Sequence, residues 1–141
     1  MKFTVRGIPI PQGTVRAFVA GGRARIASDA NRANSPLGAW RAAIRTEAQI
    51  AMAGRPTMTA PVVVVAWFEL PRPASLPKRV TEPDAKPDID KLIRALLDGM
   101  TGVVFVDDAQ VCSISAAKRY GPQPGVYVTV EEQGVGRRKA A

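Results

Sequence analysis

The acidic residues of this chain gather in one segment. Seven of the 12 Asp and Glu residues lie between positions 82 and 108, a window with only three Lys or Arg, so the window carries −4 and the rest of the chain +12. Carboxylate oxygens are the ligands that Mg²⁺ prefers, and Lys and Arg attract polyanions. This distribution indicates a site that holds a divalent cation against nucleic-acid phosphate.

Asp88 and Asp90 form the first pair of candidate ligands. They flank Ile89 at the junction between an extended segment held by Pro87 and a predicted helix. Because residue 88 precedes the helix, the two carboxylates can converge, whereas side chains at i and i+2 inside a helix diverge. The alternative interpretation is structural: Asp88 would be a helix N-cap and Asp90 a favourable charge in the first turn.

Asp107 and Asp108 form the second pair, which alone would also be typical of a turn. The segment 103–106 is short enough to fold back beside the N-terminus of the same helix, so we expect the two pairs to meet. Carboxylates brought together raise one another's pKa unless a cation neutralises them. Mg²⁺ or Mn²⁺ bound there would acidify a water, orient it toward a phosphodiester and stabilise the charge developing on the phosphate.

Arg94 lies four residues after Asp90, on the same face of the predicted helix. Its guanidinium is placed to clamp a phosphate oxygen or to offset the charge of the transition state. An ordinary surface ion pair with Asp90 is the alternative. The two roles differ in what removal of the side chain would cost.

Basic residues outside the acidic cluster are candidates for contact with a nucleic-acid backbone. The net charge of +8 favours a polyanionic partner, and nucleic acid is preferred to membrane because no long basic amphipathic helix is present. The candidates lie in a basic hairpin, in a proline-rich loop and at the start of the second helix: Arg16, Arg23, Arg25, Arg32, Arg72, Lys78, Arg79, Lys86 and Lys91. Solvated loop charges are the alternative for the hairpin arginines.

The composition excludes several chemistries. The chain has no His and a single cysteine, Cys112, which excludes a zinc site, a Cys–His or Ser–His mechanism and an internal disulfide. Cys112 lies in an apolar, strand-like stretch and is expected to be a small buried side chain. No apolar run approaches membrane-spanning length or resembles a signal peptide, so we expect a cytoplasmic protein without a membrane partner or an organic cofactor.

The periodicity of the sequence predicts the elements that position these residues. Strands are expected at 3–7, 62–68, 112–118 and 126–130, a hairpin turn at Gly21-Gly22, and helices from Ser35-Pro36 to Gly54 and from Asp88 to Gly102. The continuous apolar run 62–68 is typical of a central strand covered on both faces. Trp67 is therefore expected in the core, as is Trp40 on the apolar stripe of the first helix.

This order of elements predicts an α+β fold. We expect a single domain, 1–133, in which one sheet carries two main helices packed on one face. Segment 72–86 is expected to be a proline-rich basic surface loop, and 134–141 a flexible basic tail.

Residues 86–111 resemble the RusA family of Holliday-junction resolvases. The pattern K-P-D-x-D-x-L…L-D-x-[ML]-x-G…D-D-x-Q-V occurs there with fixed spacings, and a more diffuse likeness extends over positions 1–130. Members of this family are small, dimeric, metal-dependent endonucleases, often carried by phages and prophages. The resemblance implies a mixed sheet with helices and a two-fold homodimer.

The resemblance also assigns roles to the aspartates. Asp88, Asp90 and Asp108 match the family's metal-binding carboxylates, and Asp107 is adjacent to them. Two positions depart from the pattern, because Lys91 stands where the family usually has Asn and Arg94 where it has a functionally important Lys. Since Arg does not readily give up a proton, Arg94 is suited to charge stabilisation and not to general-acid chemistry.

The function that the resemblance implies is that of a Mg²⁺- or Mn²⁺-dependent DNA endonuclease. It would resolve four-way (Holliday) junctions in recombination and repair by symmetric hydrolysis of phosphodiester bonds. Two alternatives stay open. One is a basic nucleic-acid-binding or ribosome-associated module whose aspartates serve only as caps and turns; the other is a nuclease for flaps or other branched DNA.

Overall fold

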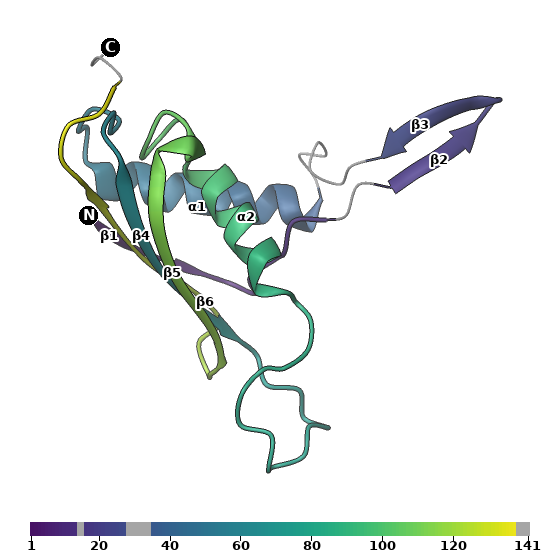
Figure 1. The fold of residues 1–141 in the computed structure, drawn as a ribbon. Helices are drawn as coiled ribbons and strands as arrows, with labels where there is room; N and C mark the ends of the chain where they lie inside the picture. Colours follow the sequence, from purple (N-terminus) through teal and green to yellow (C-terminus); the bar gives the residue numbers. More distant parts are fainter. Residues whose placement is uncertain (14–15, 28–34, 138–141) are drawn as a thin grey trace.

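A mixed four-stranded sheet with two helices on one face forms the body of the protein, as the computed structural model shows (Figure 1). The structure describes residues 1–13, 16–27 and 35–137. In chain order its elements are β1 (Lys2–Arg6), β2 (Arg16–Ala20), β3 (Arg23–Ala27), α1 (Pro36–Met52), β4 (Val62–Leu70), α2 (Ile89–Met100), the 3₁₀ turn η2 (Asp108–Gln110), β5 (Val111–Tyr120) and β6 (Gly125–Glu132). The predicted single-domain α+β fold is confirmed.

The strands of the main sheet follow the order β1-β6-β4-β5. β4 pairs with β5 in parallel, whereas β1 and β4 each pair with β6 antiparallel. A parallel pair needs a crossover connection, and the long loop and α2 between β4 and β5 supply it. α2 therefore runs opposite to β5, with its start beside the end of β5 and its end leading back to the start of β5.

The hydrophobic core lies between the sheet and the two helices. α1 buries a stripe at helical spacing that includes Leu37, Trp40 and Ile44, so the prediction that Trp40 belongs to the core is confirmed. α2 contacts α1 closely at Gly99, where an added Cβ would stand 2.7 Å from Ile44 Cγ2. Any larger side chain at position 99 would push the helices apart, which fixes α2 over the sheet.

The opposite face of the sheet is not covered by any described element. Trp67 on β4 is 49% exposed there, and the Arg119 guanidinium stacks 4.8 Å from its ring centroid. The expectations that β4 is covered on both faces and that Trp67 is a core residue are therefore wrong. β4 is central in the hydrogen-bonded sheet, but both helices pack on the same side of it.

Cys112 is also exposed, which corrects the prediction of a buried thiol. It lies on β5, which is an edge strand, at a register shift between Val62 and Val63 of β4. An apolar stretch on an edge strand is buried less than the same stretch in the middle of a sheet, because it has a neighbour on one side only.

The predicted hairpin at Gly21-Gly22 is confirmed. β2 and β3 pair antiparallel, and both glycines have positive φ, 62° and 72°, as tight hairpin turns require. Figure 1 shows the hairpin extending away from the main sheet. In the part of the chain that the structure describes, no helix has the length and apolarity to cross a bilayer. Residues 138–141 of the predicted tail lie outside the described residues.

Candidate metal and nucleic-acid site

The first pair of aspartates lies at the N-terminus of α2. Asp88 occupies the N-cap position in an extended conformation, with φ −69° and ψ 137°, and Asp90 follows in the first turn. The Asp88 carboxylate makes no capping hydrogen bond, and Lys91 Nζ lies 3.5 Å from its Oδ2. Both aspartates are exposed. Since the side chain of Asp88 does not satisfy the helix terminus, its oxygens stay available to a ligand, which a purely structural cap would not allow.

Arg94 lies one turn further along α2 and is exposed. In the described part of the chain no ion pair joins it to Asp90, so the ordinary surface pair expected as an alternative is not formed. Its guanidinium therefore stays available for an anion that approaches the N-terminal half of α2. Phosphate is such an anion, and guanidinium binds it well.

The second pair of aspartates is built into a capped turn. Asp107 Oδ1 accepts a hydrogen bond from Ala109 N at 3.0 Å, and Gln110 Oε1 accepts hydrogen bonds from Val106 N at 2.9 Å and Asp107 N at 3.0 Å. Together these bonds form a capping box around η2. One oxygen of Asp107 is thus engaged in holding the turn, and Asp108, the first residue of η2, is exposed beside it.

Gln110 anchors this turn to the rest of the protein, a role that we did not predict. The side chain is 8% exposed, and its Nε2 donates to Met58 O at 3.0 Å and to Ala60 O at 2.9 Å. A buried amide that makes four hydrogen bonds is costly to replace, because each partner would lose its bond. The Asp-x-x-Gln spacing of a capping box is the sequence signal that could have revealed it.

The environment of Asp108 is unfavourable to its negative charge. Partial desolvation raises the pKa of Asp108 above its ordinary value, and the hydrogen bond and charge of Asp107 and the charge of Asp98 raise that pKa further; the Ala109 N–H opposes them. Asp98 is itself only 3.8 Å from Arg41 Nη2. Carboxylates that raise one another's pKa leave an excess of negative charge that a cation would neutralise.

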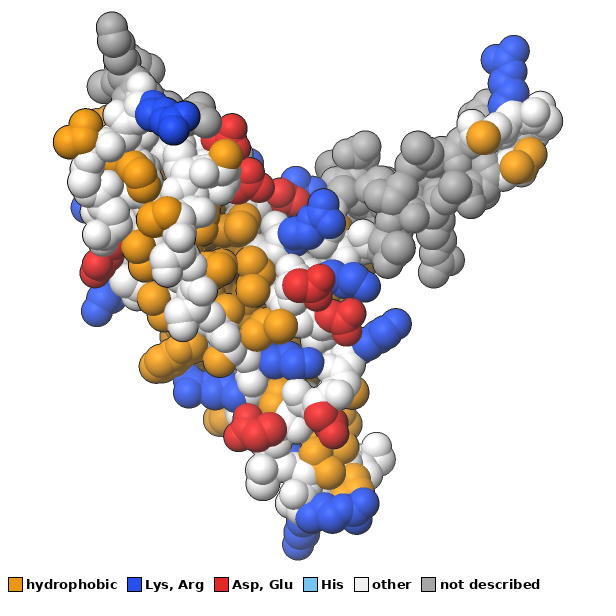
Figure 2. Space-filling model, viewed as in Figure 1, with side chains coloured by type: hydrophobic (Ala, Val, Ile, Leu, Met, Phe, Trp, Pro, Cys, Tyr) orange, Lys and Arg blue, Asp and Glu red, His pale blue; other side chains and the backbone are white. Residues whose placement is uncertain are grey.

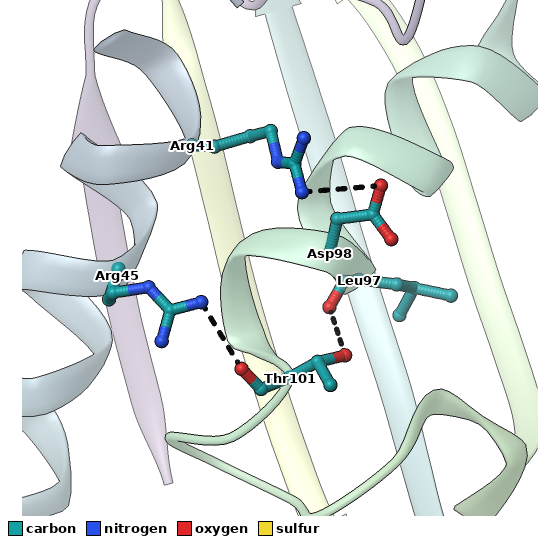
Figure 3. A network of polar contacts seen from close by, with 5 residues as sticks. All are labelled: Arg41, Arg45, Leu97, Asp98 and Thr101. Atoms are coloured by element: carbon teal, nitrogen blue, oxygen red, sulfur yellow. Dashed lines mark hydrogen bonds and ion pairs between the residues drawn. The ribbon is translucent and has the colours of Figure 1, made fainter. Parts of the chain in front are cut away.

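Polar contacts between α1 and the C-terminal half of α2 hold this end of the molecule together (Figure 3). Arg41 pairs with Asp98, and Arg45 Nη2 donates to Thr101 O at 3.3 Å. Thr101 Oγ1 donates in turn to Leu97 O at 2.8 Å. These contacts fix the point at which the chain leaves α2 for the second pair of aspartates.

The two pairs of aspartates do not meet within one chain. Gly102 N donates to Phe105 O at 2.7 Å and Val104 N to Met100 O at 2.9 Å, so segment 101–106 turns beside the C-terminus of α2. A 12-residue helix is about 18 Å long, so Asp88 and Asp107 lie beyond opposite ends of it. The expectation that 103–106 folds back beside the helix N-terminus is wrong, and among described residues no group of three or more metal-binding side chains forms.

Each pair can nevertheless supply a protein's usual share of a Mg²⁺ site. Mg²⁺ is commonly held by one or two carboxylates, with waters and substrate phosphates completing an octahedron. Asp88 and Asp90 fit this description, because both are exposed at a helix N-terminus and the Asp88 carboxylate is not used as a cap. Asp108 fits it because this carboxylate is exposed and lies beside that of Asp107.

The predicted phosphate-binding residues fall into different groups. Arg72 donates to the carbonyls of Leu76, Pro77 and Val80 at 3.5, 2.8 and 2.5 Å, so this side chain holds its own loop together. Lys78, Arg79, Lys86 and Arg23 are exposed, and Lys91 faces Asp88. The side chains of Arg16 and Arg25 and the whole of Arg32 lie outside the described part of the structure.

Figure 2 shows how these charges are distributed on one face. Basic and acidic side chains alternate over α2 and over the loop that precedes it, which lies at the bottom of the view. A polyanion that approached this face would meet exposed Lys and Arg on either side of the carboxylates of α2.

Comparison with known proteins finds a matching family and a similar protein. Residues 11–131 match the family described as Endodeoxyribonuclease RusA. The chain is also similar to YqaN, an uncharacterized protein of Bacillus subtilis (strain 168), with 26% identity over 144 residues that cover 94% of this chain and 96% of that protein. Both likenesses extend over most of the chain and include the α2 and η2 segments.

Proposed function

Because the chain belongs to the RusA family of endodeoxyribonucleases, we propose that it hydrolyses phosphodiester bonds of branched DNA with the help of Mg²⁺ or Mn²⁺. We propose four-way junctions as the substrate and recombination and repair as the setting. The observation that carries this proposal is the Asp88 carboxylate at the start of α2, which occupies the N-cap position without capping the helix. Its Oδ2 lies 3.5 Å from Lys91 Nζ, so this exposed carboxylate is turned toward a cation and not toward the helix terminus.

The metal would be held by Asp88 and Asp90, with Asp108 as the third carboxylate of the family pattern and Asp107 beside it. A bound divalent cation supplies an acidified water and stabilises charge on the scissile phosphate. The chain's own contribution is to present the carboxylates at the α2 N-terminus, where the helix dipole favours negative charge on protein and phosphate alike. Arg94, which is exposed and not paired with Asp90, would bind a phosphate oxygen.

A homodimer would place two such sites in a fixed relation, as paired incisions across a two-fold junction require. Because the two aspartate pairs are separated within one chain, the dimer would have a second role, which is to bring them together from two chains. Asp108 could reach the Asp88–Asp90 pair only from a second copy of the chain, whereas each pair acting alone would depend on water and phosphate for its remaining ligands.

Exposed basic residues would track the DNA backbone. Arg23 at the hairpin tip and Lys78, Arg79 and Lys86 in the loop before α2 are the described candidates with exposed side chains. Arg72 would contribute by shaping the loop, since its guanidinium already bonds three of the loop's carbonyls.

The test is cleavage of a synthetic four-way junction, a flap and a plain duplex of the same sequence, each with and without Mg²⁺. We expect Mg²⁺-dependent paired nicks in the junction, little cleavage of the duplex, and no incision by Asp90→Asn although this variant still binds the junction. Preferred cleavage of the flap would reassign the substrate. Junction binding without incision under any metal condition would indicate a nucleic-acid-binding module instead.

A further inference from the structure

Lys118, on the edge strand β5, bonds the backbone that leads into the α2 site. Its Nζ donates to Ala85 O at 2.6 Å and to Pro87 O at 3.1 Å. The Pro87 carbonyl belongs to the peptide unit whose nitrogen is that of Asp88. The ammonium therefore holds the peptide unit that precedes Asp88, the first candidate metal ligand.

The position of Lys118 in the sheet makes this contact possible. Lys118 is paired with Phe68 across the parallel strands β4 and β5, and Phe68 is fully buried under the helices. Paired residues on neighbouring strands share a face, so the side chain of Lys118 rises on the helix-covered side of the edge strand. From there it reaches the chain just before α2 begins.

Few other bonds hold the segment that Lys118 anchors. The loop before it is tied mainly to itself, through Leu76 N to Pro73 O at 3.1 Å, Val80 N to Pro77 O at 3.0 Å and the bonds of Arg72. Among the described residues, no other hydrogen bond ties 81–87 to the sheet. Removing Lys118 would free the last residues of the loop to move relative to the strand.

We propose that Lys118 is a positioning residue for the divalent-metal site at Asp88 and Asp90. The inference rests on the proposed function, because it takes these two carboxylates as metal ligands. An ammonium has three donors, and two of them bond the carbonyls of the residues on either side of Lys86. The backbone that leads into Asp88 is thereby held in place at the start of α2. Loss of a residue that orients a metal ligand through hydrogen bonds, without touching the metal, typically weakens metal affinity by about 10-fold to 100-fold.

Three variants separate this role from a merely structural one. Lys118→Met keeps most of the apolar stem and removes all the donors, whereas Lys118→Arg keeps the charge and donors in a different shape. Lys2→Met is the matched control, because it removes one positive charge from an exposed residue on another strand of the same sheet. Thermal unfolding of each variant shows that the fold is intact before binding is compared.

Mn²⁺ binding to the full chain without DNA, followed by electron paramagnetic resonance, is the decisive measurement. We expect Lys118→Met to bind Mn²⁺ at least about 10-fold more weakly than Lys2→Met, and Lys118→Arg to recover part of the loss. Hydrogen exchange should be faster in 81–88 of Lys118→Met and unchanged in Lys2→Met. In cleavage assays the Mg²⁺ concentration for half-maximal rate should rise, while the rate at saturating Mg²⁺ falls less.

The outcomes distinguish this inference from the proposed function. Equal Mn²⁺ affinity in Lys118→Met and Lys2→Met would overturn the positioning role, even if the wild type cleaves junctions. Weakened Mn²⁺ binding and faster exchange in a protein that cleaves no DNA would retain the role of Lys118 and reject the nuclease. A wild type that binds no Mn²⁺ without DNA but cleaves junctions would overturn the positioning role and leave the proposed function standing. If Lys118→Met does not fold, Lys118→Gln, which removes the charge and shortens the side chain, takes its place, and wild-type Mn²⁺ affinity and exchange in that variant would count against the inference.

Discussion

Replacement of Arg94 by alanine tests whether its guanidinium takes part in cleavage. Arg94 is exposed and makes no ion pair with Asp90 in the described structure. Its removal should therefore leave stability within about 0.5 kcal/mol of the wild type, the usual range for exposed helical positions. Any large effect on cleavage must then come from the complex with DNA.

The size of that effect can be worked from the helix geometry. Arg94 lies four residues, or about 6 Å of helical rise, beyond Asp90. One unit of negative charge that develops on the phosphate at about 6 Å, in an effective dielectric of about 20, interacts with the guanidinium by roughly 2.8 kcal/mol. That energy corresponds to about 100-fold in rate, the scale seen when one charge-stabilising donor is removed from an active site.

Single-turnover cleavage of a four-way junction at saturating Mg²⁺ is the assay. We expect Arg94→Ala to be slower by about 100-fold or more, Arg94→Lys to retain substantial cleavage, and junction affinity to change much less. Lys2→Ala, which removes a positive charge from β1, at the other edge of the sheet from β5, is the control and should cleave normally. A near-normal rate for Arg94→Ala would refute the reasoning and remove this residue from the mechanism.

Three further predictions follow from charge and symmetry. The pKa of Asp108 is raised in the folded protein, so the charge of this carboxylate destabilises the fold above that pKa. Metal-free Asp108→Asn should therefore melt at a higher temperature than the wild type at pH 7, and the difference should vanish as the pH falls below the ordinary pKa of an aspartate. A lower melting temperature of the variant at pH 7 would contradict this. Junction affinity should fall steeply between 50 and 200 mM salt, on the order of 10³-fold if six or more phosphates are contacted, and a flat response in a filter-binding titration would exclude backbone tracking. Sedimentation should show a homodimer at micromolar concentration. If one active site contains residues of two chains, mixing the inactive variants Asp90→Asn and Asp108→Asn should restore nicking. A monomer bound to the junction would contradict both the homodimer and the shared site.

Local patterns were sufficient to predict most of the elements. The apolar residues of α1 recur at helical spacing after Ser35 and Pro36, and the structure buries that stripe, including Trp40. Ser35 Oγ accepts a hydrogen bond from Gly38 N at 3.0 Å, as an N-cap should. The hairpin at Gly21-Gly22 and the end of α2 before Gly102 follow from positive φ, which glycine adopts at little cost. Interactions within a few residues decide such features, so the sequence carries them directly.

The coverage of the sheet could not be predicted in the same way. The apolar run 62–68 indicates a strand, and that strand is observed, but nothing in the run states which elements pack over each face. Both helices pack on one side, and this leaves Trp67 under Arg119 on an open face and Cys112 exposed on an edge strand. Burial of a strand residue depends on which segments, often distant in the sequence, pack over its face of the sheet.

The amino-acid sequence by itself determined the family, which the match over 11–131 shows, and the candidate site residues, the aspartates at 88, 90, 107 and 108. The tertiary structure decided how those residues are placed. Backbone bonds at Gly102 and the anchoring of Gln110 turn the chain beside the C-terminus of α2, so the two pairs lie apart. Lys118 reaches Pro87 across 31 positions of sequence. Contacts of this kind depend on how the strands are ordered and which way they run, and no local pattern of residues records that order.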